Sequence, residues 1–203
     1  MSGIIAQNSG RHTGLIKAAS GAGVWTLINT ITASSDSSVD FTSGIDGTYA
    51  EYIIKFHDVH TSNTVDASYA YDLNCNFSID GGSNFNVTKT SSTWRTRIAE
   101  SGAYATFAHY SDQNQVTTDT LIADDPEGDN DQSTVGYMHL FNPSDTTFVK
   151  HFIIVSQYMH GFPTTAQFNS HGYCNTTSAV DAVTFIPSGG TIDAGSFSLY
   201  GIS

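Results

Sequence analysis

The stretch DLNCNFSID, residues 72–80, shows the fold class of this chain most clearly. Apolar side chains occupy every second position and small polar ones stand between them: Leu73, Cys75, Phe77 and Ile79 alternate with Asn74, Asn76 and Ser78. Successive side chains of a strand point to opposite faces, so this period of two predicts a half-buried β-strand. The DGGSN that follows (80–84) offers glycines for the positive φ angles of a tight turn, and we predict a β-hairpin there.

Similar runs continue on both sides of this stretch. EYIIKFHDVH (51–60) places Tyr52, Ile54 and Phe56 on one face. Turns rich in Gly, Asn, Asp and Pro separate further expected strands at 23–33, 102–110, 134–142, 147–159, 165–175, 180–186 and 191–202. No stretch carries a 3.6-residue period long enough to predict a helix. Residues 23–203 are therefore predicted to form one all-β domain, a jelly-roll-like β-sandwich.

Residues 1–22 differ from the rest of the chain. They are short of aromatic residues, contain four glycines and show no sustained period. We interpret them as an extended N-terminal arm whose candidate partner-binding residues are Ile4, Ile5, Arg11, Leu15 and Ile16. A disordered leader is the alternative interpretation.

The charge balance limits the partners that this chain can have. Seven Lys and Arg residues stand against nineteen Asp and Glu residues, which gives a formal net charge of −12. Binding to a polyanion requires Lys and Arg to neutralise phosphates, so neither nucleic acid nor an anionic membrane surface is an expected partner. Charged residues are only 13% of the chain, which favours a surface that packs against neighbours at a small cost in desolvation.

The N-terminus and the cysteines give two further expectations. The first residues show no export-signal pattern, and no apolar run approaches the roughly 18 residues that span a membrane. Cys75 and Cys174 both lie in strand-like runs and are interpreted as buried thiols. A disulfide between them is the alternative.

Candidate catalytic and metal-binding residues form no recognisable motif. The eight histidines lack zinc-ligand spacing, and no Ser or Cys stands in a nucleophile motif. The acidic loop IADDPEGDNDQ (122–132) could wrap Ca²⁺ with the carboxylates of Asp125, Glu127, Asp129 and Asp131. These residues lack the calcium-loop spacing, and a solvated loop is the alternative. We therefore expect neither enzymatic activity nor a cofactor.

Five segments from both ends of the chain form an unusual combination: IIAQNSGRHTGLIKA (4–18), WTLINTITASSDSSVDFTSGID (25–46), TYAEYIIKFHDVH (48–60), SIDGGSNFN (78–86) and GGTIDAGSFSLYGIS (189–203). Taken together they resemble a group of bacteriophage structural proteins, seen especially in phages of marine and other aquatic bacteria. Residues 91–188 do not contribute to this resemblance. The resemblance implies a β-sandwich virion protein that is made in the host cytoplasm and sits on the outer surface of the particle.

Two locations on the particle follow from this resemblance. A capsid decoration (cement) protein would bind the major capsid protein or other virion subunits through its arm and loops, and it would form a homo-oligomer. The alternative is a tail fibre or spike module that recognises a host surface glycan. Exposed aromatic residues would then stack on sugar rings, and the candidates are Trp94, Tyr104, Tyr110, Tyr158 and Tyr173. The resemblance carries no catalytic residue over to this chain.

Overall fold

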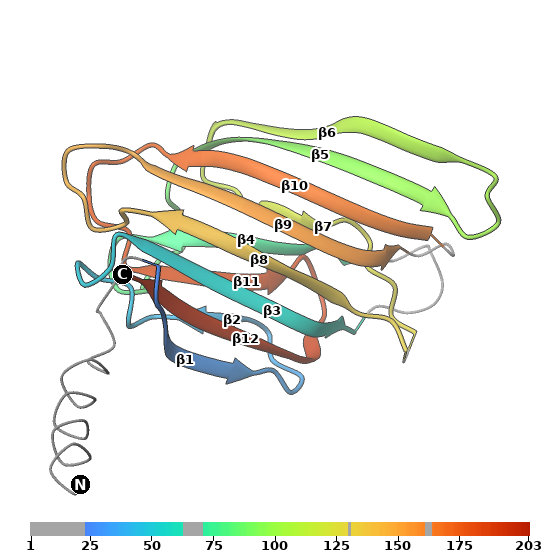
Figure 1. The fold of residues 1–203 in the computed structure, drawn as a ribbon, viewed down its shortest axis with the longest axis horizontal. Helices are drawn as coiled ribbons and strands as arrows, with labels where there is room; N and C mark the ends of the chain where they lie inside the picture. The colour runs from blue at the N-terminus through green and yellow to red at the C-terminus, as the bar shows by residue number, and fades with distance from the viewer. Residues whose placement is uncertain (1–22, 63–70, 130, 161–163) are drawn as a thin grey trace, which may run out of the picture.

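A computed structural model describes residues 23–62, 71–129, 131–160 and 164–203, which form two antiparallel sheets packed as a sandwich (Figure 1). The strands are β1 (Trp25–Thr32), β2 (Val39–Phe41), β3 (Glu51–Thr61), β4 (Leu73–Ser78), β5 (Lys89–Ala99), β6 (Ala105–Val116), β7 (Thr120–Ala123), β8 (Thr134–Phe141), β9 (Lys150–His160), β10 (Thr164–Cys174), β11 (Ala182–Pro187) and β12 (Ile192–Ile202). The eight-stranded sheet has the order β1-β12-β3-β8-β9-β10-β5-β6, and the four-stranded sheet has the order β2-β11-β4-β7.

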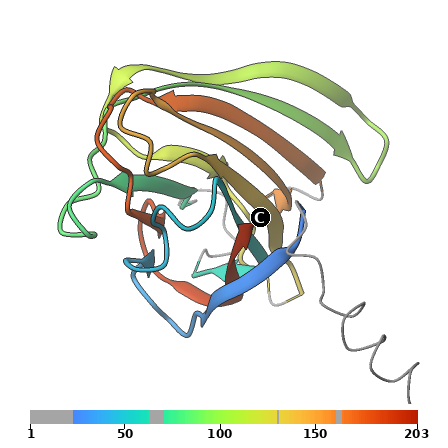
Figure 2. The same ribbon diagram turned by 60° about the vertical axis from the view of Figure 1, so that its left-hand side comes forward.

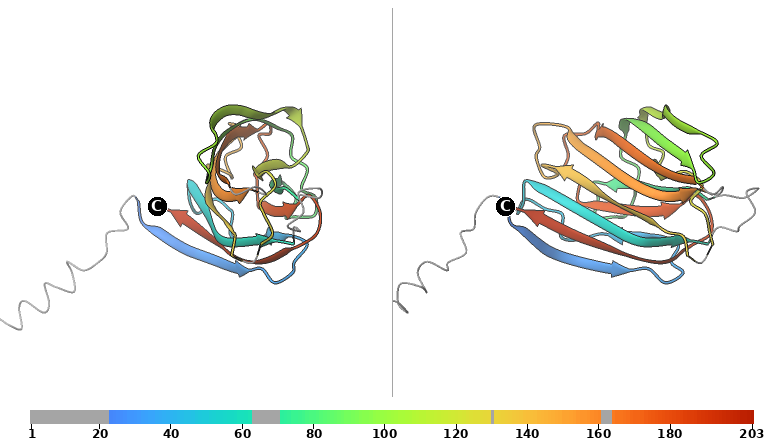
Figure 3. Two further views of the ribbon diagram at one scale, coloured as in Figure 1. Left: turned by 90° about the vertical axis from the view of Figure 1, so that its right-hand side faces the viewer. Right: turned by 45° about the vertical axis from the view of Figure 1, so that its right-hand side comes forward.

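This strand order is that of a jelly roll extended by two pairs of consecutive antiparallel strands. When β5–β6 and β9–β10 are set aside, β1-β12-β3-β8 packs against β2-β11-β4-β7, the two sheets of an eight-stranded jelly roll. Both pairs extend the larger sheet beyond β8. Figures 2 and 3 show that this sheet is strongly curved, with β1 and β6 at its two edges. The predicted all-β, jelly-roll-like sandwich is confirmed.

The core lies between the sheets and is rich in aromatic rings. Phe56 of the larger sheet packs on Phe185 of the smaller one, with ring centroids 5.7 Å apart, and Phe197 closes the group at 5.0 Å from Phe185. Tyr52, Ile54 and Phe56 are all buried, so the face predicted for residues 51–60 is the core face of β3.

The prediction that β4 is half-buried is wrong, because all six of its residues are buried. Its polar face is covered by the chain that leads from β6 to β7 and by the turn after β4. The Asn76 Nδ2 group donates to the Thr117 carbonyl at 3.0 Å, and the Ser78 hydroxyl accepts from the Gly82 amide at 3.0 Å. Alternation therefore identified the strand but not the cover over its second face.

The turn after β4 has the predicted conformation but makes no hairpin. Gly81 and Gly82 adopt φ angles of +70° and +82°, and Asp80 accepts from the Asn84 amide at 2.9 Å. β4 pairs with β11 and β7, however, whereas the next strand, β5, belongs to the other sheet. The turn carries the chain from one sheet to the other.

The predicted arm at 1–22, with Ile4, Ile5, Arg11, Leu15 and Ile16, lies outside the described residues. The two cysteines are free thiols, and both are buried, as predicted for small apolar side chains. Within the described part of the chain, no helix has the length and apolar character needed to cross a membrane.

Candidate binding face on the eight-stranded sheet

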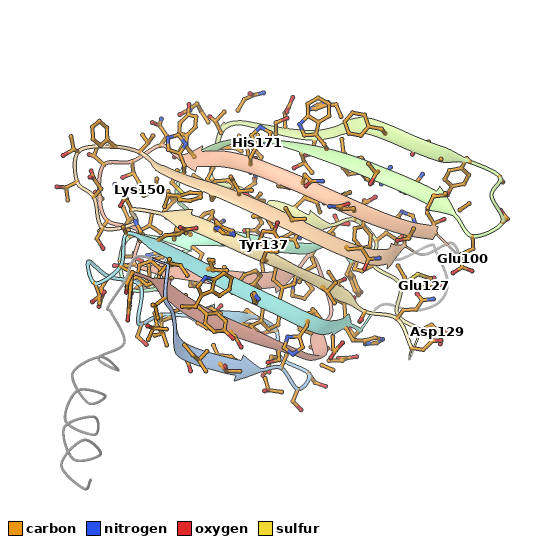
Figure 4. All side chains as sticks on the ribbon, in the orientation of Figure 1. Glu100, Glu127, Asp129, Tyr137, Lys150 and His171 are labelled. Atoms are coloured by element: carbon orange, nitrogen blue, oxygen red, sulfur yellow. The ribbon has the colours of Figure 1, made fainter. Side chains whose placement is uncertain are left out.

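The face of the eight-stranded sheet that points away from the four-stranded sheet is called the outer face here. The pairing register aligns side chains across this face in two rows. The first row runs Lys55, Tyr137, Val155, Asn169, Trp94 and His109 over six adjacent strands. The second row runs Tyr200, Ile53, His139, Ile153, His171, Ser92 and Asp112. Figure 4 labels Tyr137 on β8 and His171 on β10 within these rows.

An aromatic pair stands at the β6 edge of the outer face. Trp94 and Phe107 stack with ring centroids 5.4 Å apart and an interplanar angle of 10°. Trp94 is 38% exposed and Phe107 is 69% exposed. His109 meets Trp94 edge-on, with centroids 5.9 Å apart, and the His109 imidazole is 2.9 Å from the Asp112 carboxylate. This hydrogen bond holds the pKa of Asp112 below its usual value.

A second exposed group stands at the β1 edge. Trp25 is 47% exposed and Leu27 is 56% exposed. The Lys55 ammonium lies over the Trp25 ring, 4.6 Å from its centroid, and Tyr200 packs beside the ring at 5.7 Å. Exposed apolar side chains therefore stand at both edges of the outer face.

The five aromatic residues named from the sequence are not equally placed. Trp94 and Tyr104 are exposed, and the Tyr104 hydroxyl lies 3.0 Å from that of Thr164. Tyr110 packs against the core instead, with its ring 5.1 Å from Phe168. Tyr158 is completely buried, so neither Tyr110 nor Tyr158 belongs to the outer face. Tyr173 is partly buried beside the His151 ring, with centroids 6.1 Å apart.

Sequence reasoning missed Phe107, which is more exposed than its stacking partner Trp94 at the β6 edge. The signal was available in TFAHY (106–110), where alternation puts Phe107 and His109 on one face and Tyr110 on the other. Which of these two faces is covered depends on the strands packed beneath, and those come from distant parts of the sequence.

A polar group fills the inner side of the extended sheet; Asp124, Arg95, His160, Tyr110 and Tyr158 form it and are called the Asp124 cluster. Asp124 pairs with the Arg95 guanidinium and lies 3.6 Å from His160 Nε2. Its backbone amide donates to the Tyr158 hydroxyl at 3.2 Å. Burial opposes ionisation of Asp124, but hydrogen bonds from His160 and Tyr110 and the charge of Arg95 hold its pKa below the usual value.

Backbone amides of the acidic loop bond to other parts of the chain. The Asp125 amide donates to the Asp72 carboxylate at 3.1 Å, and the Glu127 amide donates to the Met159 carbonyl at 3.0 Å. Asp131 lines a small open cavity, whereas Glu127 and Asp129 lie at the periphery in Figure 4. Among the residues that the structure describes, no three His, Cys, Asp or Glu side chains gather where they could hold a metal ion, and this includes the loop proposed for calcium.

No family model, no curated protein and no solved structure matches this chain.

Proposed function

We propose that this chain is a structural subunit of a bacteriophage particle, a decoration (cement) protein that binds the outer surface of the head. The observation that carries the proposal is the outer face of the eight-stranded sheet. Exposed apolar side chains stand at both of its edges, and Lys55 and Asp112 are the only formally charged members of its two cross-strand rows. The proposal gives the protein no catalytic role.

The distribution of charge supports a protein partner. Removing a charged side chain from water is costly, so a face with few charges can be covered at small cost. The chain as a whole carries a net charge of −12, which opposes contact with the packaged genome and favours a position outside the shell. We therefore assign the outer face to the major capsid protein, or to neighbouring subunits that repeat with the lattice.

Repetition on a lattice makes weak individual contacts sufficient. Each copy of a decoration protein would meet the same surface at symmetry-related positions, and linked contacts between neighbours would add their binding free energies. The predicted arm at 1–22 would add a further contact, with Ile4, Ile5, Leu15 and Ile16 as its apolar side chains.

The test is binding of the purified full chain to phage heads, measured by co-sedimentation and by particle imaging. Phe107→Ser and Trp94→Ser remove the exposed aromatic pair and are expected to weaken binding. Ile79→Ser is the matched control, because Ile79 is a 43% exposed side chain that follows β4 of the other sheet. Equal binding of all three variants and the wild type would reject the outer face, and density on the tail alone would reject the head location.

One observation favours a second function, recognition of a host glycan by a tail fibre or spike. The Trp94–Phe107 pair presents exposed aromatic surface on which a sugar ring could stack, and Asn169 is the cross-strand neighbour of Trp94. Titration with host surface polysaccharide separates the two proposals. Saturable binding that Phe107→Ser abolishes, without binding to heads, would support the tail function instead.

A further inference from the structure

Lys89 is a fully buried lysine at the start of β5. Its Nζ atom lies 2.6 Å from the side-chain oxygen of Asn76 and 3.1 Å from the Val87 carbonyl. Asn76 is 1% exposed and belongs to β4. Because β5 and β4 lie in different sheets, the contact between these two side chains links the two layers of the sandwich.

The Asn76 amide is held from both ends. The Phe77 backbone N–H donates to its Oδ1 atom at 2.9 Å, on the same side as the lysine. Its Nδ2 group donates to the Asp119 carboxylate at 2.7 Å and to the Thr117 carbonyl at 3.0 Å. The carbonyl end therefore faces an amine and an N–H donor, and the NH₂ end faces a carboxylate.

Burial and the Asp119 carboxylate act on the pKa of Lys89 in opposite directions, and burial has the larger effect. Burial lowers its pKa, because the ammonium ion loses its hydration. Cys75 and Cys174 interact with Lys89, and burial raises the pKa of both thiols, that of Cys174 to about 12. These thiols are neutral at pH 7 and add no negative charge beside Lys89, so the Asp119 carboxylate is the group that favours the ammonium form. The lowered pKa enlarges the share of Lys89 that is present as the neutral amine, which is the nucleophilic form.

We propose that Lys89 and Asn76 form an intramolecular isopeptide bond that joins the two sheets covalently. The side-chain carbonyl carbon of Asn76 is one bond of about 1.23 Å from Oδ1, so Lys89 Nζ starts within about 3.8 Å of it. In the reaction Nζ forms a bond to this carbon, the bond from the carbon to Nδ2 breaks, and Nδ2 leaves as ammonia. The amine and the primary amide become a secondary amide, with no change in oxidation state.

The neighbouring groups fit the steps of this reaction. The Phe77 N–H is placed to stabilise the negative charge that develops on Oδ1 during attack. Asp119 accepts a proton from the attacking nitrogen and delivers it to the leaving nitrogen, which already donates to it, and the carboxylate is unchanged at the end. Asp119 is exposed at the surface, so ammonia can leave beside it.

The bond would close a covalent ring over residues 76–89, which includes the turn between the sheets. Such a cross-link restricts the unfolded chain in the way that a disulfide does, and it also withstands reducing conditions. The two free cysteines could not supply an equivalent link without an oxidant.

The first test is the intact mass of the full chain, purified in the folded state. We expect a mass lower than the sequence mass by one molecule of ammonia. Trypsin should then fail to cleave after Lys89, and the digest should contain residues 56–95 as one looped peptide. The full sequence mass, or loss of ammonia with normal cleavage after Lys89, would overturn the proposal.

Variants separate the bond from a hydrogen bond that merely holds the core. Asp119→Asn changes an exposed side chain, so the protein is expected to fold and to keep its full sequence mass. Lys150→Met is the control for loss of a buried lysine, since Lys150 Nζ donates to the backbone carbonyls of Phe148 and Thr176 at 2.9 and 3.3 Å. This variant should still lose ammonia between Asn76 and Lys89. Loss of ammonia at Lys89 in Asp119→Asn would overturn the role given to the carboxylate.

Discussion

Replacing Asp124 with asparagine tests the Asp124 cluster with little change in side-chain volume. The Arg95 and Asp124 side chains are 15% and 20% exposed, and Arg95 also lies over the Tyr110 ring at 3.9 Å. Removing one partner of a buried ion pair costs about 3–5 kcal/mol, because the other charge stays buried without compensation. Residual exposure lets water screen Arg95, so we expect the free energy of unfolding to fall by about 2–3 kcal/mol.

The same variant should change the acid sensitivity of the protein. Because the pKa of Asp124 is lowered in the folded state, its carboxylate stabilises the fold above the unfolded pKa of about 3.9. That contribution is lost as the pH falls through the lower folded pKa. Below about pH 4 the wild type should therefore lose stability more steeply than Asp124→Asn, and the two stabilities should converge.

Urea unfolding followed by tryptophan fluorescence, at neutral pH and in acidic steps, measures both effects. Asp112→Asn is the matched control, because its partner His109 and Asp112 itself are each 48% exposed, and we expect no measurable loss of stability. A double-mutant cycle with Arg95→Met isolates the coupling between the two charges. The ion pair does not stabilise the fold in this way if Asp124→Asn is as stable as the control variant at pH 7, or if it loses stability in parallel with the wild type on acidification.

Three further predictions concern packing. Gly136→Ala should destabilise the fold by about 1–3 kcal/mol, because the new Cβ would lie only 2.3 Å from the Val155 carbonyl oxygen. Thermal unfolding measures this loss, and Gly47→Ala, which has room for a Cβ, should unfold at nearly the same temperature as the wild type. Phe77→Ala should cost about 3–5 kcal/mol in urea unfolding, and equal losses for Phe77→Ala and the exposed Phe107→Ala would contradict the burial assigned to these rings. Both cysteines should resist a thiol reagent until the protein unfolds, since both thiols are buried; rapid labelling of the native protein would show that their cover is incomplete.

The fold class could be predicted from the sequence because a strand with one covered face has apolar residues at every second position. Tyr52, Ile54 and Phe56 stand at every second position of β3 and all face the core. The same pattern does not show in which of the two sheets a strand lies. The turn at 80–84 has the residues of a hairpin, yet it connects two sheets, because pairing partners are chosen among strands far apart in the chain.

The outer face could be predicted only in part for the same reason. Trp94 was named among five candidates for an exposed aromatic residue, but its alignment with Tyr137 was not expected, because that alignment depends on the registers of β8, β9, β10 and β5 together. A single aromatic residue on a strand looks the same in sequence whether it faces the core or the solvent. Tyr110 and Trp94 show this, since both lie in alternating runs and only Trp94 remains exposed.

The wrong prediction for β4 and the proposed isopeptide bond have one physical origin. Asn76 was assigned to a solvated face because it is polar, and Lys89 gives no sign of burial in the sequence, since lysine is almost never fully buried without a partner. Their burial leaves an amine and a primary amide, with all their N–H donors, in a place where each unsatisfied donor is costly. Conversion to a secondary amide leaves one N–H donor and one carbonyl oxygen, and the Phe77 amide already donates to that oxygen. The arrangement that contradicts the half-buried strand is therefore the one that favours the covalent bond.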